Sequence, residues 1–225
     1  LPICGDSPAS REAPAASDAL AADLERRFGG LARLYGSDNY RRLRALRVAA
    51  VGRGGVGSWA VETMARSGVA ALTLIDMDHV SESNINRQIQ ATSATLGMAK
   101  GEALAQRVRS IHPACHVVVV DAFVEEGAWP ALLPAPVDVL IDACDQVRAK
   151  ALLAVWSLRE GVPMVCTGAA GGKRDAAQLQ VDDLARVTHD PLLAALRQRL
   201  RRDVALRDVA RGAKGFGLRC VFSRE

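Results

Sequence analysis

A glycine-rich turn constrains this chain more than any other feature. The apolar run 48–51 leads into Gly52, and Gly54 and Gly57 complete the spacing G-x-G-x-x-G just before a segment with helical periodicity. In this pattern the first glycine permits a tight turn, the second lets the backbone approach a phosphate, and the third lets the helix pack closely on the strand. The first amides of the helix have no partners of their own and the helix end is positively polarised, so an anion fits there. The pattern therefore predicts a strand–turn–helix unit that binds a nucleotide.

An aspartate follows at the distance that such a unit requires. Asp76 comes directly after the apolar stretch 71–75, about 20 residues beyond the glycines, where a carboxylate can accept hydrogen bonds from ribose hydroxyls. We therefore expect Asp76 to hold the ribose. A solvated aspartate at the end of a strand is the alternative.

Apolar stretches and helical patterns alternate along the chain. The stretch Val117–Val120 shows no apolar–polar alternation, which is typical of a parallel strand buried on both faces. The sequence predicts an α/β fold with a doubly wound, mostly parallel sheet: a Rossmann-like nucleotide-binding half followed by a C-terminal extension of the sheet. A chain of 225 residues, 49% of them hydrophobic, is long enough for one such domain. The expected strands are 47–51, 71–75, 117–120, 137–141, 163–167, 178–181 and 218–222.

Composition divides the chain into three parts. Residues 1–16 are rich in Pro, Ala and Ser, and we expect them to form a flexible tail before a single domain over 17–225. Within that domain, 183–217 is expected to be a basic helical crossover segment. Such segments are usually solvated faces, but this clustering also suits contact with a nucleic-acid backbone. The cations concerned are Arg197, Arg199, Arg201, Arg202, Arg207, Arg211 and Lys214.

Two function classes are disfavoured by composition. No apolar run approaches the roughly 20 residues that span a membrane, and the first residues lack the pattern of a secretion signal. The five cysteines include no C-x-x-C pair and no zinc-ligand spacing. An odd, scattered set of cysteines favours a reducing compartment, so we expect a cytoplasmic protein.

Four further motifs accompany the glycine turn. They are Asp76-x-Asp78, the run 83–88 reading Ser-Asn-Ile-Asn-Arg-Gln, Gly97-x-x-Lys100 and Asp142-x-x-Asp145. Together with the glycines they resemble the ubiquitin-activating-enzyme-like superfamily, which includes the ThiF and MoeB adenylating enzymes. Within it, the stretches 27–36, 74–78 and 218–225 are most similar to the tRNA threonylcarbamoyladenosine dehydratases.

The resemblance implies a homodimeric enzyme that uses ATP and Mg²⁺ on the modified adenosine beside the tRNA anticodon, with a sulfur-transfer protein as a further partner. The carboxylate of the threonylcarbamoyl group is adenylated with release of pyrophosphate, and ring closure then releases AMP, so that the net reaction is a dehydration. By the same resemblance the catalytic residues are Arg87, Lys100 and Asp145, and Asp145 holds the metal. The residues implied to bind the nucleotide are Gly52, Gly54, Gly55, Gly57, Asp76, Asp78, Asn84, Arg87, Gln88 and Lys100.

The sequence also departs from the relatives. Their arginine from the partner subunit has two candidates here, Arg27 and Arg33, and Arg53 is an unusual cation within the glycine turn. Cys220 is interpreted as a small buried strand residue, with a covalent acceptor as the alternative. Some relatives carry an apolar tail beyond the counterpart of Glu225, so membrane contact through such a tail stays open.

Three other functions compete with this interpretation. The sulfur-carrier activators of the superfamily carry two zinc-binding C-x-x-C pairs, which are absent here. A nicotinamide dehydrogenase shares the glycine turn and the strand-end acid but has no need of Lys100 and Asp145 around a metal. A non-catalytic RNA-binding partner subunit tends to lose the phosphate and metal residues, whereas this chain retains them.

Overall fold

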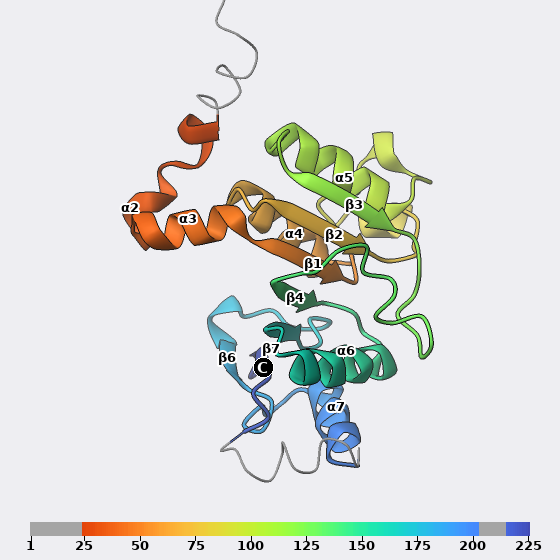
Figure 1. The fold of residues 1–225 in the computed structure, drawn as a ribbon. Coiled ribbons are helices and arrows are strands. Elements are labelled where there is room, and N and C mark those ends of the chain that lie inside the picture. The colour runs from red at the N-terminus through yellow and green to blue at the C-terminus, as the bar shows by residue number, and fades with distance from the viewer. Residues whose placement is uncertain (1–23, 203–214) are drawn as a thin grey trace, which may run out of the picture.

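The computed structural model describes residues 24–202 and 215–225, and the tail predicted for 1–16 lies outside that part of the chain. Its described residues form one seven-stranded sheet with the order β3-β2-β1-β4-β5-β7-β6, in which only β6 runs antiparallel to its neighbour (Figure 1). The predicted doubly wound, mostly parallel sheet is thus confirmed. The strands are β1 (Arg47–Val51), β2 (Ala71–Ile75), β3 (His116–Val120), β4 (Val139–Asp142), β5 (Met164–Thr167), β6 (Leu179–Asp183) and β7 (Arg219–Ser223).

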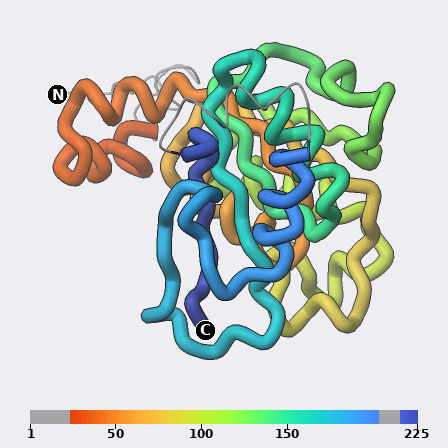
Figure 2. The backbone as a smooth tube through the Cα atoms, turned by 90° about the horizontal axis from the view of Figure 1, so that it is seen from below, coloured from red at the N-terminus to blue at the C-terminus, as the bar shows by residue number. Residues whose placement is uncertain are grey.

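Helices lie between most of these strands, in line with the alternation of apolar stretches and helical patterns in the sequence. Two N-terminal helices, which follow a helical turn over 24–28, stand out from one side of the sheet in both views (Figures 1 and 2). The helices are α2 (Leu31–Tyr35), α3 (Ser37–Ala45), α4 (Gly57–Arg66), α5 (Lys100–Ile111), α6 (Val147–Glu160) and α7 (Pro191–Arg202). Short 3₁₀ turns occur at η1 (Glu82–Asn84), η2 (Ser93–Thr95) and η3 (Ala176–Gln178).

Both faces of the sheet are covered, as strand β1 makes clear. Successive side chains of a strand point to opposite faces. Val48 and Ala50 belong to a buried cluster that includes α4 and α5, whereas Ala49 and Val51 belong to a second cluster that includes α6 and α7. The central strand therefore separates two apolar layers, which is why its four residues after Arg47 read as a continuous apolar run.

Strand β3 corrects one prediction. Its lack of alternation predicted burial on both faces, but Val117–Val120 are only partly buried. The reason is that β3 lies at the edge of the sheet and pairs with β2 alone. A run of valines favours a strand through side-chain shape, and it does not fix the position of that strand in the sheet.

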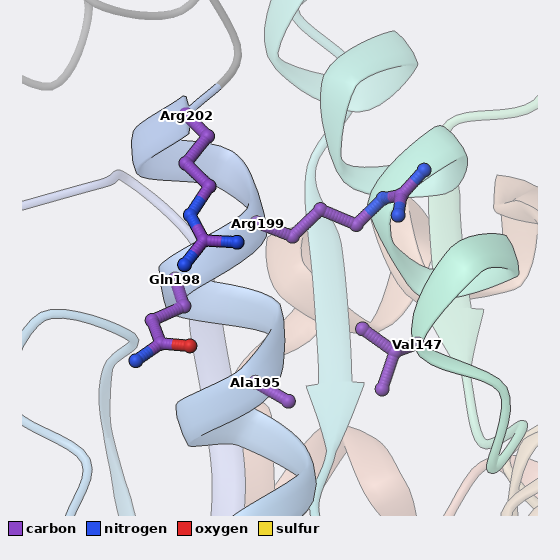
Figure 3. Close-up of a pocket in the computed structure, with 5 residues that line it drawn as sticks. All are labelled: Val147, Ala195, Gln198, Arg199 and Arg202. Atoms are coloured by element: carbon purple, nitrogen blue, oxygen red, sulfur yellow. The ribbon is translucent and has the colours of Figure 1, made fainter.

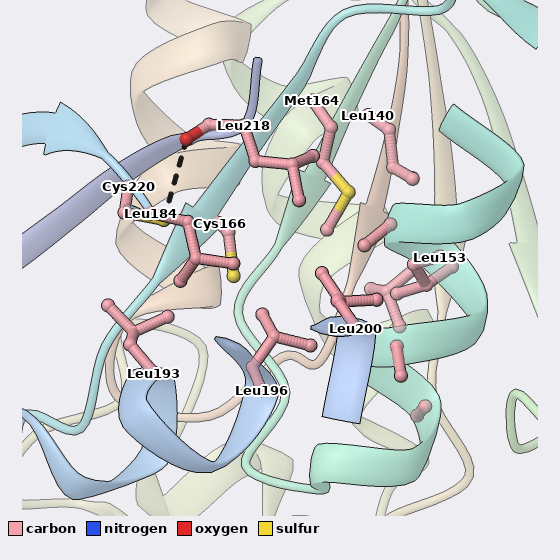
Figure 4. Close-up of a cluster of buried hydrophobic side chains, with 14 of the residues drawn as sticks. Leu140, Leu153, Met164, Cys166, Leu184, Leu193, Leu196, Leu200, Leu218 and Cys220 are labelled. Atoms are coloured by element: carbon pink, nitrogen blue, oxygen red, sulfur yellow. Dashed lines mark hydrogen bonds between the residues drawn. The ribbon is translucent and has the colours of Figure 1, made fainter. Parts of the chain in front are cut away.

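The C-terminal extension places β7 between β5 and the edge strand β6. Cys220 of β7 pairs in register with Cys166 of β5, and both are fully buried. Leucines of α6 and α7 pack over them, and the Cys220 thiol contacts the carbonyl of Leu218 at 3.8 Å (Figure 4). The predicted basic crossover is helical over α7, and its residues 203–214 lie outside the described part.

Helix α4 packs against the glycine turn so closely that only glycine fits at its first position. A Cβ atom on Gly57 would lie 1.8 Å from the carbonyl oxygen of Gly52, whereas a Cβ atom on Gly54 would meet no atom within 4 Å. We expect Gly57→Ala to lower the free energy of unfolding by about 1–3 kcal/mol through overpacking.

Gly54→Ala is the matched control for this change, measured by urea unfolding of both variants. Its stability is expected to stay within about 0.5 kcal/mol of wild type, as for most substitutions without a new clash. Equal stability of the two variants would contradict the close packing of α4 on the turn.

Candidate active site

A cavity of about 780 Å³ lies at the carboxyl ends of the parallel strands. Open α/β sheets bind ligands at this edge, because the loops that follow neighbouring strands converge there. All of the site residues predicted from the sequence line this cavity except Gly57, whose backbone is packed against Gly52. The structure therefore brings together Gly52, Gly54, Gly55, Asp76, Asp78, Asn84, Arg87, Gln88, Lys100 and Asp145.

The glycine turn forms the floor of the cavity and is in direct contact with the segment that follows β4. Gly52 has a φ of 81°, and a Cβ atom there would lie 2.6 Å from the amide nitrogen of Cys144. Glycine is thus required twice over, by the backbone angle and by the close approach. Gly54 has open space above it, which leaves room for a ligand to approach the backbone.

Arg87 is held beside the glycine turn by its own loop. Its Nη1 donates to the carbonyl of Ser83 at 2.7 Å and to Oδ1 of Asn86 at 2.9 Å. The Arg87 stem lies 3.4 Å from where a Cβ atom of Gly55 would be. The guanidinium is thus oriented before any ligand arrives.

Asn84 and Gln88 have structural tasks in the same loop. Asn84 is buried and its Oδ1 accepts from the amide of Ser81 at 3.1 Å, which closes the turn η1. The buried side chain of Gln88 accepts from Nε2 of Gln90 at 3.1 Å. Both residues line the cavity, and they also build the loop that carries Arg87.

Lys100 is the first residue of α5, where its positive charge opposes the helix dipole. Its Nζ donates to Oδ2 of Asp78 at 2.7 Å, and its backbone amide donates to the carbonyl of Asp78 at 2.8 Å. The lysine side chain is 7% exposed and that of Asp78 is 56% exposed. Asp78 therefore orients Lys100 at the cavity wall.

Asp76 lies deeper, with both carboxylate oxygens engaged by backbone amides. Oδ2 accepts from the amide of Arg53 at 2.6 Å, and Oδ1 accepts from the amide of Asp78 at 3.0 Å. These two bonds point the carboxylate along the cavity wall, where its remaining lone pairs can accept from a ligand.

The two aspartates of Asp142-x-x-Asp145 differ in their surroundings. Asp142 is fully buried, and its Oδ2 accepts from Nζ of the fully buried Lys150 at 3.0 Å and from the thiol of Cys166 at 3.2 Å. Burial lowers the pKa of Lys150, but Asp142 more than offsets this and holds that pKa above its ordinary value. Asp145 is exposed at the cavity and forms no ion pair or hydrogen bond with any residue that the structure describes.

Sequence reasoning missed part of the cavity wall. Residues 122–124, which follow β3, line it, and Phe123 among them remains 44% exposed. The glycine-rich loop 168–171 after β5 also lines it; its sequence favours a turn between strands, with a second phosphate contact as the alternative. Both segments follow parallel strands, so the strand ends themselves were the signal that could have identified them.

A shallower groove of about 440 Å³ runs between α6 and α7 beside this cavity. Val147, at the start of α6, lines it, and its neighbour Gln146 lines the main cavity. Arg199 extends from α7 toward α6, with Arg202 one turn further along α7 (Figure 3). Neither arginine forms an ion pair within the part of the chain that the structure describes. The groove is lined by Val147, Ala195, Gln198, Arg199 and Arg202.

Residues 27–199 match the model of the ThiF family. The chain belongs to this family. Curated relatives include the tRNA threonylcarbamoyladenosine dehydratase of Escherichia coli, 47% identical over 88% of this chain and 74% of the relative. The enzyme of the same name from Haemophilus influenzae is 42% identical over 90% of this chain and 77% of the relative.

Solved structures agree with this family assignment. The crystal structure of the Escherichia coli tRNA N6-threonylcarbamoyladenosine dehydratase in complex with ATP is 46% identical and superposes with a TM-score of 0.84. The match covers 89% of this chain and 82% of that one. Among the described residues of this ThiF family member, no helix is both long and apolar enough to cross a membrane.

The surroundings of Cys220 favour the structural interpretation of this residue. It is fully buried in β7 and is absent from the cavity lining. We expect Cys220→Ser to keep substantial activity, while its free energy of unfolding falls by about 1–3 kcal/mol because a hydroxyl replaces a buried thiol.

Two measurements check this expectation, thermal unfolding and intact-protein mass spectrometry in the presence of ATP. A covalent adduct on Cys220, together with an inactive serine variant, would make this cysteine a covalent acceptor instead.

Proposed function

We propose that this chain is an ATP-dependent tRNA threonylcarbamoyladenosine dehydratase. It adenylates the carboxylate of N6-threonylcarbamoyladenosine beside the tRNA anticodon, releases pyrophosphate, and closes the activated acyl group into a ring with loss of AMP. One observation carries the proposal: the glycine turn, Arg87, Lys100 and Asp145 line a single cavity. The similarity to an enzyme of that name solved with ATP supports the choice of substrate.

The arrangement of charges suits the adenylation step. Carboxylate and triphosphate are both anions, so fixed cations must offset their repulsion as they approach. Arg87 and Lys100 are held in place by Ser83 and Asp78, and they require little reorganisation during the reaction. Asp76 accepts from the ribose, and the open backbone at Gly54 admits the phosphates. No side-chain nucleophile is needed, because the substrate carboxylate itself attacks the α-phosphate.

Asp145 fits the magnesium ion that the superfamily implies. Mg²⁺ in such sites is held by one or two carboxylates together with substrate phosphates and water. Asp145 offers one exposed carboxylate at the cavity, and the described residues contain no cluster of three or more ligands that would form a dedicated metal cage. When bound, the ion offsets negative charge on the phosphates that leave.

The proposal includes a homodimer. Neither Arg27 nor Arg33 lines the cavity of its own chain, and Arg27 donates to the carbonyl of Ile111 at 2.7 Å. Leu34 and Tyr35 of α2 are 70% and 50% exposed, which suits coverage by a second subunit. A cytoplasmic location agrees with the four free cysteines of the described residues. The sulfur-transfer partner remains an implication of the resemblance alone.

The competing functions fit these observations less well. Sulfur-carrier activators carry two zinc-binding C-x-x-C pairs, and this sequence has none. A dehydrogenase reaction would not use the ordered Lys100–Asp78 pair or the exposed Asp145. A silent RNA-binding subunit has no need of a complete set of phosphate-facing residues around one cavity.

Asp145 provides the sharpest test of the proposal, by nucleoside mass spectrometry on tRNA incubated with and without ATP. The wild-type enzyme is expected to lower the mass of the modified nucleoside by one water only when ATP is present. Asp145→Asn keeps the shape of the side chain but removes the charge that holds the metal, so we expect loss of pyrophosphate release by about 10²-fold or more.

The fold of the variant is checked by its thermal unfolding, which should match wild type because Asp145 is exposed and unpartnered among the described residues. Near-normal turnover of Asp145→Asn would remove this residue from the mechanism. Unchanged tRNA with the wild-type enzyme and ATP would refute the proposed reaction.

Arg199 and Arg202 are proposed to contact tRNA phosphates, because their groove adjoins the cavity. Arg197, predicted to share this role, instead donates to the carbonyls of Leu184 and Val187 at 3.1 and 2.8 Å and braces α7. Arg207, Arg211 and Lys214 lie outside the described residues.

Each of Arg199→Gln and Arg202→Gln is expected to reduce the salt dependence of tRNA binding, by about 0.7–0.9 in the log–log slope per lost phosphate contact. ATP affinity should stay unchanged. Arg109→Gln on α5, whose arginine pairs with Glu102, is the control with an unaltered slope. Wild-type slopes in both groove variants would assign these arginines to a solvated face.

A further inference from the structure

Arg53 extends its side chain away from solvent, beneath the glycine turn. The residue stands between Gly52 and Gly54, and only 1% of it is exposed. Its Nη2 donates to the backbone carbonyl of Asp76, and its Nε lies 3.7 Å from Oδ2 of the same residue. The proposed mechanism makes no use of this buried cation.

A glycine on α5 leaves the room that the guanidinium occupies. A Cβ atom on Gly101 would lie 1.8 Å from Nη1 of Arg53 and 2.5 Å from Cγ1 of Val119. Gly101 is next to Lys100 at the helix start. The buried position of the Arg53 side chain therefore requires a glycine at position 101.

The Arg53 guanidinium lies near several carboxylates, but two of its nitrogens have no hydrogen-bond partner among the described residues. Burial lowers the pKa of Arg53, and the negative charges of Asp76, Asp121 and Asp78 oppose that effect. Its Nε and Nη1 are buried and have no hydrogen-bond partner in the described residues. A buried guanidinium in this state is costly, and its attraction to nearby carboxylates is what offsets the cost.

We propose that Arg53 is a positioning residue for Asp76, and that Arg53 and Gly101 form a matched pair which fixes the ribose-binding carboxylate. The inference rests on the proposed function in one respect, the role of Asp76 toward the ribose. Arg53 lines the same cavity and contacts Asp76 at two places, the backbone carbonyl and the carboxylate. The guanidinium places a positive charge beside the nearly buried Asp76 carboxylate, whose other contacts are with the backbone amides of Arg53 and Asp78.

The proposal predicts that removal of the Arg53 guanidinium weakens recognition of the ribose and not of the phosphates. Arg87 and Lys100 are held by Ser83 and Asp78, without contact to the Arg53 guanidinium, so recognition of the phosphates survives its removal. Loss of the guanidinium leaves the Asp76 carboxylate held by its two backbone amides alone, so its orientation toward the ribose hydroxyls is less fixed. This change weakens an acceptor for the ribose hydroxyls and leaves the rest of the nucleotide site intact.

The experiment compares the binding of ATP and of 2′,3′-dideoxy-ATP by isothermal titration, which needs no tRNA. Wild type is expected to bind ATP about tenfold or more tightly than the dideoxy analogue, as for hydrogen bonds to a charged group. In Arg53→Leu the two affinities should become nearly equal, because only that for ATP falls. Arg53→Lys keeps a cation near Asp76 and should retain most of the discrimination. Arg109→Met is the control, with wild-type values for both ligands.

A second measurement tests the matched pair through thermal unfolding and does not depend on any nucleotide. In the otherwise wild-type protein, Gly101→Ala should lower the melting temperature by about 4 °C or more, because the new methyl group clashes with Arg53. In the Arg53→Leu background the same change should lower it by clearly less, because only the contact with Val119 remains. The double variant Arg53→Leu/Gly101→Ala refills the vacated space, and it serves for the titrations if the single variant does not fold.

The outcomes separate this inference from the proposed function. The inference would be overturned if Arg53→Leu still preferred ATP over the dideoxy analogue as wild type does. It would also be overturned if Gly101→Ala lowered the melting temperature equally in both backgrounds. Either result would leave the dehydratase proposal standing. A wild-type chain that binds neither nucleotide would overturn the proposed function together with the ribose role of Asp76. A merely structural Arg53 would weaken the binding of both ligands equally, which also refutes the positioning role.

Discussion

The contact of the glycine turn with the segment after β4 is the constraint on which the site depends. Gly52 packs on the backbone of Ala143 and Cys144, and Gly57 packs on the carbonyl of Gly52. The same few atoms therefore set the start of α4, the floor of the cavity and the path of the chain toward Asp145. A side chain at either glycine would move the glycine turn away from the loop that carries Asp145. The positions of these two parts of the cavity are thus coupled through backbone packing.

Charge balance is the second level of organisation. Each buried cation near the cavity lies against a carboxylate: Lys100 with Asp78, Arg53 with Asp76, and Lys150 with Asp142. Such pairing orients the cations and offsets the cost of burying their charges. The cost of ordering these cations is met during folding, so that little reorganisation remains when two anions react.

Much of this arrangement could be predicted from the sequence, because the fold brings together the ends of neighbouring parallel strands. Asp76 and Asp145 follow such strands, and the glycine turn fixes the strand from which to count. The edge position of β3 could not be predicted, because a run of valines does not determine how many neighbours a strand has. The burial of Arg53 was also hidden, since it depends on a glycine 48 positions away in a different element.

The two aspartates of one motif show where local sequence stops being informative. Asp142 and Asp145 are identical in chemistry, yet one is sealed in the core and the other lines the cavity. The difference is made by Lys150, one turn into α6, whose ammonium donates to Asp142 and also to the carbonyl of Thr167 at 2.8 Å. That ion pair joins β4, β5 and α6 at the base of the cavity. Because Asp142 is already paired with Lys150 there, Asp145 is the carboxylate of this motif that is exposed at the cavity.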